Sequence, residues 1–171
     1  MTAQHIQQSI NKVIGYYREH PEEARSKDKP ATAALEEGLR CRATGPNGAE
    51  LVSDMPQALG GGGTPATPGW FLRAALANCD ATVIAMRAAQ LGIALSHLEV
   101  TVDSISDDKG LLGMDEETFA GPYSVRMKIC IGAEGVDAET LHEIIAWTER
   151  HSPVADAIRR AVPTVVEVEI A

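Results

Sequence analysis

Aromatic residues and long apolar runs are both scarce in this chain. Phe, Trp and Tyr make up 4% of the 171 residues, so most of the 44% apolar content is aliphatic. No stretch of 18 uninterrupted apolar residues occurs, and no basic segment followed by an apolar one opens the chain, so neither a transmembrane helix nor a signal peptide is expected. The length and composition predict a single soluble domain over residues 1–171. Without an expected signal peptide or membrane span, the cytoplasm is the expected location.

Clustered positive charge is also lacking. The formal net charge is −9, and no basic cluster exceeds the pair Arg159 and Arg160, so neither nucleic acid nor an anionic membrane is expected as a partner. No group of Cys, His and Asp has metal-ligand spacing, so no metal and no cofactor is expected. The glycines at 60–63 lack the patterns of phosphate-binding loops and predict a flexible stretch instead.

Cysteine is rare, and its spacing excludes two classes of protein. The chain has three cysteines, Cys41, Cys79 and Cys130. Their odd number argues against a disulfide scaffold, and the lack of a C-x-x-C motif argues against a thioredoxin-type redox pair. Strand alternation places Cys41 on an inward face and Cys130 on an outward face. Cys79 lies in the most apolar helical stretch of the chain, where a thiol is either inert filling or a shielded nucleophile.

That stretch predicts a long central helix over residues 68–92. Its only charges are Arg73, Asp80 and Arg87, which are seven residues apart and predict one narrow polar stripe. A row of buried apolar residues is expected on a different face of this helix from the polar stripe, and Cys79 is expected to point inward from that row. The predicted members of the row follow a 4-3 spacing and are Leu72, Leu76, Cys79, Val83 and Met86.

The remaining patterns predict an α+β fold with helices on one side of an antiparallel or mixed sheet. Thr67, Asp137 and Ser152 are expected to cap helix N-termini, and Gly92 is expected to end the central helix. Other expected elements are a helix at 3–19, a connection at 20–30, a hairpin turning at 46–48, strands at 98–103, 125–131 and 166–170, and a loop or lid at 107–121.

The order of these elements resembles the OsmC/Ohr family of organic-hydroperoxide-handling proteins across residues 33–170. The matching motifs are at 68–79, 92–93 and 151–154. The resemblance implies a sheet packed on a long central helix, an intertwined homodimer and thiol peroxidase sites at the subunit interface. Residues 1–30 would then be an N-terminal helix and connection added to the family core.

Two positions depart from the pattern of the family's catalytic members, which carry two cysteines. Cys79 matches the first, but Ser152 stands where the second would be, and Gly69 replaces a glutamate that orients an arginine beside the thiol. Arg40 or Arg42 on the early strand is a candidate for that arginine, although both also fit a solvated strand face.

Trp70 and Phe71 near the start of the central helix fit either a core or the apolar wall of a substrate pocket. Ser152 can line that pocket in addition to capping its helix. A serine hydrolase built on Ser152, His151 and Asp156 is disfavoured, because no G-x-S-x-G elbow is present.

Two functions follow from the resemblance. In the first, Cys79 reduces organic hydroperoxides as a lone peroxidatic cysteine, and an external thiol restores it. In the second, a non-catalytic dimer of the same fold binds a small hydrophobic ligand.

Overall fold

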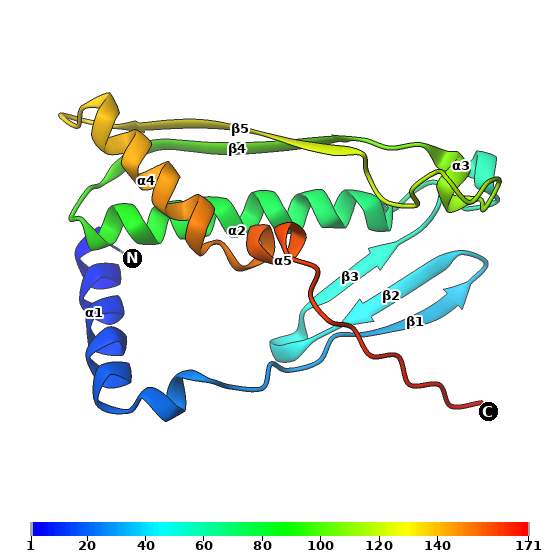
Figure 1. Cartoon of the computed structure of the whole chain (residues 1–171), viewed down its shortest axis with the longest axis horizontal. Coiled ribbons are helices and arrows are strands. Elements are labelled where there is room, and N and C mark those ends of the chain that lie inside the picture. The colour runs from blue at the N-terminus through cyan, green and yellow to red at the C-terminus, as the bar shows by residue number, and fades with distance from the viewer. Residues whose placement is uncertain (1, 171) are drawn as a thin grey trace. The chain divides into compact units, whose positions relative to one another are not determined.

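The computed structural model describes residues 2–170, which form two compact units (Figure 1). One unit comprises residues 8–74, and the other comprises the described residues before Gln8 and after Ala74. Helices and antiparallel strands occur in both units, which confirms the predicted α+β class. The helices α1 (Ala3–Glu19) and α2 (Pro68–Gln90) each continue from one unit into the other.

The unit of residues 8–74 contains a three-stranded antiparallel sheet in the order β1-β2-β3. Its strands are β1 (Thr32–Glu37), β2 (Arg40–Thr44) and β3 (Glu50–Ser53). The turn predicted between β2 and β3 is the short helix η2 (Pro46–Gly48), in which Asn47 has a φ of 59°. The sequence did not predict β1 because all six of its residues are exposed and no inward–outward alternation marks it. Two further short helices are η1 (Pro21–Ala24) and η3 (Gln57–Leu59).

The glycine run at 60–63 forms a loop built around Asp54, and the expected flexibility of this stretch stays a prediction. Asp54 is 6% exposed, and its carboxylate accepts hydrogen bonds from the Met55 amide at 2.7 Å and the Gly62 amide at 3.0 Å. A Cβ added at Gly61 would lie 1.9 Å from the carbonyl oxygen of Met55. The loop therefore requires glycine at this position for close backbone approach.

We expect Gly61→Ala to lower the free energy of unfolding by about 2 kcal/mol, because the backbone must shift to admit the methyl group. Gly121→Ala is the matched control, since its Cβ would meet nothing within 4 Å. Urea unfolding of both variants measures the difference. Equal stabilities would contradict the close packing at Gly61.

The second unit is built on a long antiparallel hairpin, and helices cover one of its faces (Figure 1). The hairpin joins β4 (Leu95–Ile105) to β5 (Ser124–Ala133), and the connection contains the short helix α3 (Asp108–Leu111). The core consists of Ile84 and Ala88 from α2 and Ile144 from α4 (Ala138–His151), packed on aliphatic residues of both strands. The helix α5 (Pro153–Arg159) follows α4 after one residue.

Side-chain and glycine caps delimit the helices as predicted. Thr67 Oγ1 accepts from the Trp70 amide at 3.2 Å, and Asp137 accepts from the Thr140 amide at 2.7 Å. Gly92 has a φ of +74°, which only glycine adopts freely, and ends α2.

The face of α2 that is buried in the chain differs from the predicted row of buried residues. Leu72 and Met86 are 41% and 42% exposed, whereas the buried residues follow a 4-4 spacing. Because Ala, Leu, Val and Ile occur all round this helix, the apolar pattern alone cannot select one face. The residues that are buried are Leu76, Asp80, Ile84, Ala88 and Ala89.

The strand predicted at 166–170 does not form within the single chain, and the expectation is corrected for the chain alone. Residues 162–170 have no regular structure, and Val166, Val168 and Ile170 are 79%, 77% and 96% exposed. A strand requires a hydrogen-bonded neighbour, and no described strand pairs with this segment.

Candidate functional site

The structure brings two of the predicted site residues, Cys79 and Ser152, into direct contact. The Ser152 hydroxyl donates a hydrogen bond to Cys79 Sγ with an Oγ–Sγ distance of 3.3 Å. Cys79 is half-buried on α2, and Ser152 is completely buried between α4 and α5. The thiol therefore faces a fixed polar donor and keeps partial access to solvent.

Ser152 is held in place by hydrogen bonds to both neighbouring helices. Its amide donates to the Thr148 carbonyl at 2.9 Å, and its own carbonyl accepts from the Asp156 amide at the same distance. Its Oγ also accepts from the Ala155 amide at 3.4 Å, which confirms the predicted N-cap. Because Oγ accepts from an amide while donating to sulfur, the two bonds strengthen each other.

A stack of side chains braces the end of α4 just before Ser152. The rings of Trp147 and His151 lie 3.9 Å apart and nearly parallel, at 8°. The Arg87 guanidinium from α2 lies 4.9 Å from the centre of the Trp147 ring, a cation–π distance. The stack thus ties the turn that carries Ser152 to the helix that carries Cys79.

Arg40 and Arg42 belong to the unit of residues 8–74, where both pair with acidic residues. Arg40 Nε lies 3.0 Å from Glu36, and Arg42 contacts Glu36 at 2.5 Å and Glu50 at 3.1 Å. Hydrogen bonds from Arg42 and then Arg40 hold the pKa of the Glu36 carboxyl below its usual range. A role for either arginine beside Cys79 stays a prediction.

The pairing of Glu36 with Arg42 and Arg40 predicts how the stability of the fold changes with pH. Since its folded pKa lies below the ordinary value of 4.5, the pair stabilises the fold above that value, and this contribution disappears as the pH falls through the folded pKa. Arg42→Gln should therefore raise the pKa of Glu36, as followed by NMR titration of its side-chain carboxyl. Arg126→Gln, which breaks an ion pair with Asp103, should leave it unchanged. An unaltered Glu36 titration in Arg42→Gln would contradict the assignment.

Trp70 and Phe71 lie in the first turn of α2 and contact each other edge-on, with ring centres 5.5 Å apart. Trp70 is 49% exposed, which does not fit a core position. Their role as the wall of a substrate pocket stays a prediction.

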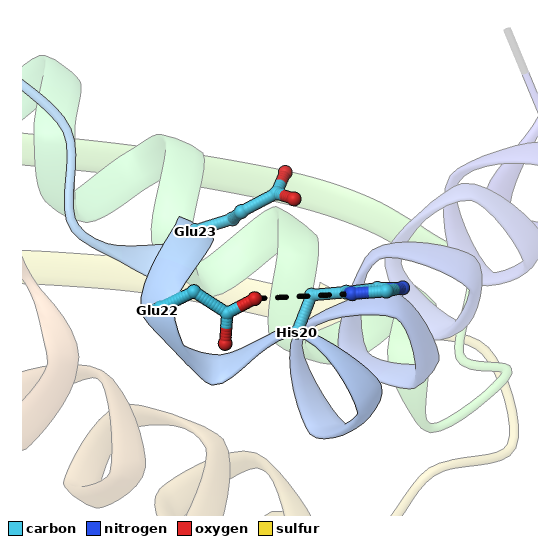
Figure 2. A group of neighbouring side chains, drawn as sticks. All are labelled: His20, Glu22 and Glu23. Carbon is cyan, nitrogen blue, oxygen red and sulfur yellow. Dashed lines mark ion pairs between the residues drawn. The ribbon is translucent and has the colours of Figure 1, made fainter.

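One group within residues 2–170 brings three potential metal ligands together: His20, Glu22 and Glu23 (Figure 2). His20 Nδ1 lies 3.9 Å from Glu22, and Glu23 accepts a hydrogen bond from the Tyr16 hydroxyl at 2.5 Å. Both carboxylates are exposed to solvent. Exposed acidic groups of this kind are common in proteins without a bound ion, so these three residues do not define a metal site.

Sequence reasoning missed Asp80, which it assigned to a polar stripe. Asp80 directly follows Cys79 but is only 2% exposed, and its Oδ1 has no hydrogen-bond partner among the described residues. The available signal was an acidic residue within the apolar stretch. Of the other two cysteines, Cys41 is half-buried on β2, and Cys130 is exposed on β5 as expected.

Comparison with known proteins identifies the class of this fold. The model of the OsmC-like protein family matches residues 61–167. Solved structures with the same fold include an OsmC-like protein from Mycoplasma pneumoniae, with a TM-score of 0.66 and 16% identity, over 79% of this chain and 89% of the other. An OsmC-like protein of unknown function from Vibrio cholerae has a TM-score of 0.64 and 11% identity, over 77% and 94%.

A third similar structure is an organic hydroperoxide resistance protein from Elizabethkingia anophelis. It has a TM-score of 0.58 and 19% identity, over 79% of this chain and 90% of the other. No curated protein matches the sequence. The chain belongs to the OsmC-like family, which confirms the resemblance read from the motif around Cys79. Within residues 2–170, no helix combines the length and apolar character needed to cross a membrane.

Proposed function

We propose that this protein reduces organic hydroperoxides with Cys79 as its nucleophile. The observation that carries the proposal is the hydrogen bond donated by Ser152 to Cys79 Sγ at 3.3 Å. A donor aimed at sulfur stabilises negative charge there, and the thiolate is the reactive form of cysteine. The similar structure from Elizabethkingia anophelis is named as an organic hydroperoxide resistance protein, and that name supports the proposed class of substrate.

In the first step, the Cys79 thiolate attacks the terminal oxygen of a hydroperoxide ROOH. An S–O bond forms while the O–O bond breaks, and the departing alkoxide takes a proton to become the alcohol ROH. Cys79 is thereby oxidised to a sulfenic acid, and the hydroperoxide is reduced.

Turnover then requires a thiol from outside the chain, because the Ser152 hydroxyl cannot form a disulfide. One external thiol condenses with the sulfenic acid, giving a mixed disulfide and water. A second external thiol attacks that disulfide, releasing the oxidised reductant and restoring the Cys79 thiol. The reductant is thus a low-molecular-weight thiol or a thiol protein.

The test is hydroperoxide consumption in the presence of excess thiol. We expect Cys79→Ser to fall to the uncatalysed background rate, because serine is not oxidised by hydroperoxides. Cys130→Ser is the matched control, since it removes an exposed thiol on β5 and should leave the rate unchanged. Loss of consumption in Cys130→Ser instead would overturn the proposal.

A second candidate function is the binding of a small hydrophobic ligand without catalysis. It is favoured by a cavity of about 400 Å³ between β5 and α4, a volume within the usual range for ligand sites. Its apolar lining is Ile129, Ile131, Ala138, Leu141 and Ile145. The Cys79→Ser variant distinguishes the two functions. If the protein only binds a ligand, the variant should retain the ligand affinity and show no loss of hydroperoxide consumption beyond background, whereas a peroxidase should lose its hydroperoxide consumption.

We further propose that the protein acts as an intertwined homodimer in the cytoplasm. Unpaired cysteines fit a reducing compartment. Val166, Val168 and Ile170 alternate with two glutamates in an exposed segment, as in a strand that lacks its partner. The three-stranded sheet and the two-stranded sheet both have outer edges that are unpaired in the described chain. Such an edge can pair with a strand from a second copy.

A further inference from the structure

The buried carboxylate of Asp80 calls for a positively charged partner. Its Oδ1 is the one buried side-chain N or O atom that lacks a hydrogen bond among the described residues. An isolated carboxylate removed from water costs several kcal/mol unless a cation or donor compensates for the lost hydration. No group in the described chain donates a hydrogen bond to Oδ1, so this atom is open to a donor from outside the described chain.

Asp80 lines a cavity of about 190 Å³ within the second unit. The surrounding apolar wall is formed by Leu76 beside Asp80 and by residues of β5 and α5. Those residues are Val125, Met127, Ala155 and Ile158. A buried carboxylate on an apolar wall is the arrangement that binds a molecule with one charged end and one hydrocarbon end.

Two further charges, Glu149 and Arg159, line the same cavity and are themselves exposed. No ion pair joins Arg159 to either carboxylate within the described residues. The side chains around the cavity thus carry two negative charges and one positive charge, so the net charge favours a cation. An anionic ligand would have to lie against the Asp80 carboxylate, which repels it.

We propose that this cavity binds a small primary amine in its protonated form, with a short aliphatic body. The ammonium group supplies three donors, of which one satisfies Asp80 Oδ1, and the hydrocarbon lies against Leu76 and Met127. A cavity of about 150 Å³ in another protein holds benzene, so about 190 Å³ accommodates six to eight non-hydrogen atoms. Neither Cys79 nor Ser152 lines this cavity, and the proposal does not depend on the reactivity of Cys79.

The experiment is isothermal titration of the full-length protein at neutral pH with three probes of matched shape. The probes are 3-methylbutylamine, which is cationic, 3-methylbutan-1-ol, which is neutral, and 3-methylbutanoate, which is anionic. We expect the amine to bind about tenfold more tightly than the alcohol, because only the amine adds a charge-assisted hydrogen bond, and the acid not to bind. Alcohol and amine of equal affinity would overturn the proposal, as would no binding of the amine.

Asp80→Asn should lose the preference for the amine over the alcohol, whereas Glu99→Gln on the exposed face of β4 should retain it. Glu149→Gln provides a second variant at an exposed position, where a folding defect is not expected, and should weaken amine binding. NMR of the Met127 and Ile158 methyl groups locates the bound probe. Amine binding that leaves these methyls unshifted, or that persists unchanged in Asp80→Asn, would contradict the assignment.

Discussion

Replacing Ser152 with cysteine is expected to make hydroperoxide drive formation of a disulfide with Cys79. The serine oxygen already lies 3.3 Å from Cys79 Sγ, and the bond length of about 2.05 Å between two sulfurs is reached by small side-chain rotations. The sulfenic acid at Cys79 would condense with the new thiol and release one water. The variant would then be restored by a dithiol such as dithiothreitol.

The measurement is intact-protein mass spectrometry after one equivalent of an alkyl hydroperoxide. The disulfide form is lighter than the reduced variant by two hydrogens, and peptide mapping should join residue 152 to Cys79. Ser96→Cys, which places a thiol on the exposed side of β4, is the matched control and should form no such link. A Ser152→Cys variant that accumulates sulfenic acid without this disulfide would show that the two side chains do not meet in solution.

Removing residues 162–171 is expected to convert the proposed homodimer into a monomer. In the single chain residues 162–170 are all exposed, and Val165 and Ile170 are 85% and 96% exposed. Pairing with a second copy would bury the apolar side chains and satisfy the backbone hydrogen bonds of the segment. Deletion removes that contribution and leaves only the remaining contacts between copies.

Light scattering after size exclusion measures the mass, which we expect to be twice 18.2 kDa for the intact protein. A paired substitution, Val166→Arg with Val168→Arg, tests the same segment without shortening the chain and should also give monomers. Glu167→Gln with Glu169→Gln is the matched control on the opposite face and should remain dimeric. A dimer that persists in both the deletion and the arginine variant would refute strand exchange.

The sequence predicted the features that depend on local interactions. Helix caps require only a short side chain or a glycine at one position, and Thr67, Asp137 and Gly92 act as expected. The contact between Cys79 and Ser152 was anticipated from the family pattern, which places both positions at one site, and the hydrogen bond between them bears out their proximity.

The sequence did not predict features that depend on which neighbour an element packs against. Apolar residues occur all round α2, so the burial of Asp80 and the exposure of Met86 follow from packing within the unit rather than from periodicity. The loop formed by the glycines at 60–63 was not predicted, because Asp54, the residue around which it is built, accepts a hydrogen bond across several residues. The strand β1 shows no alternation, since both of its faces are exposed in the chain.

The central claim is that Cys79 is the thiol that reacts with hydroperoxide. The direct test treats the reduced protein with an alkyl hydroperoxide and a sulfenic-acid-specific reagent such as dimedone, followed by peptide mass spectrometry. The account predicts the adduct at Cys79 ahead of the more exposed Cys130. Modification of Cys130 while Cys79 remains a free thiol would contradict it.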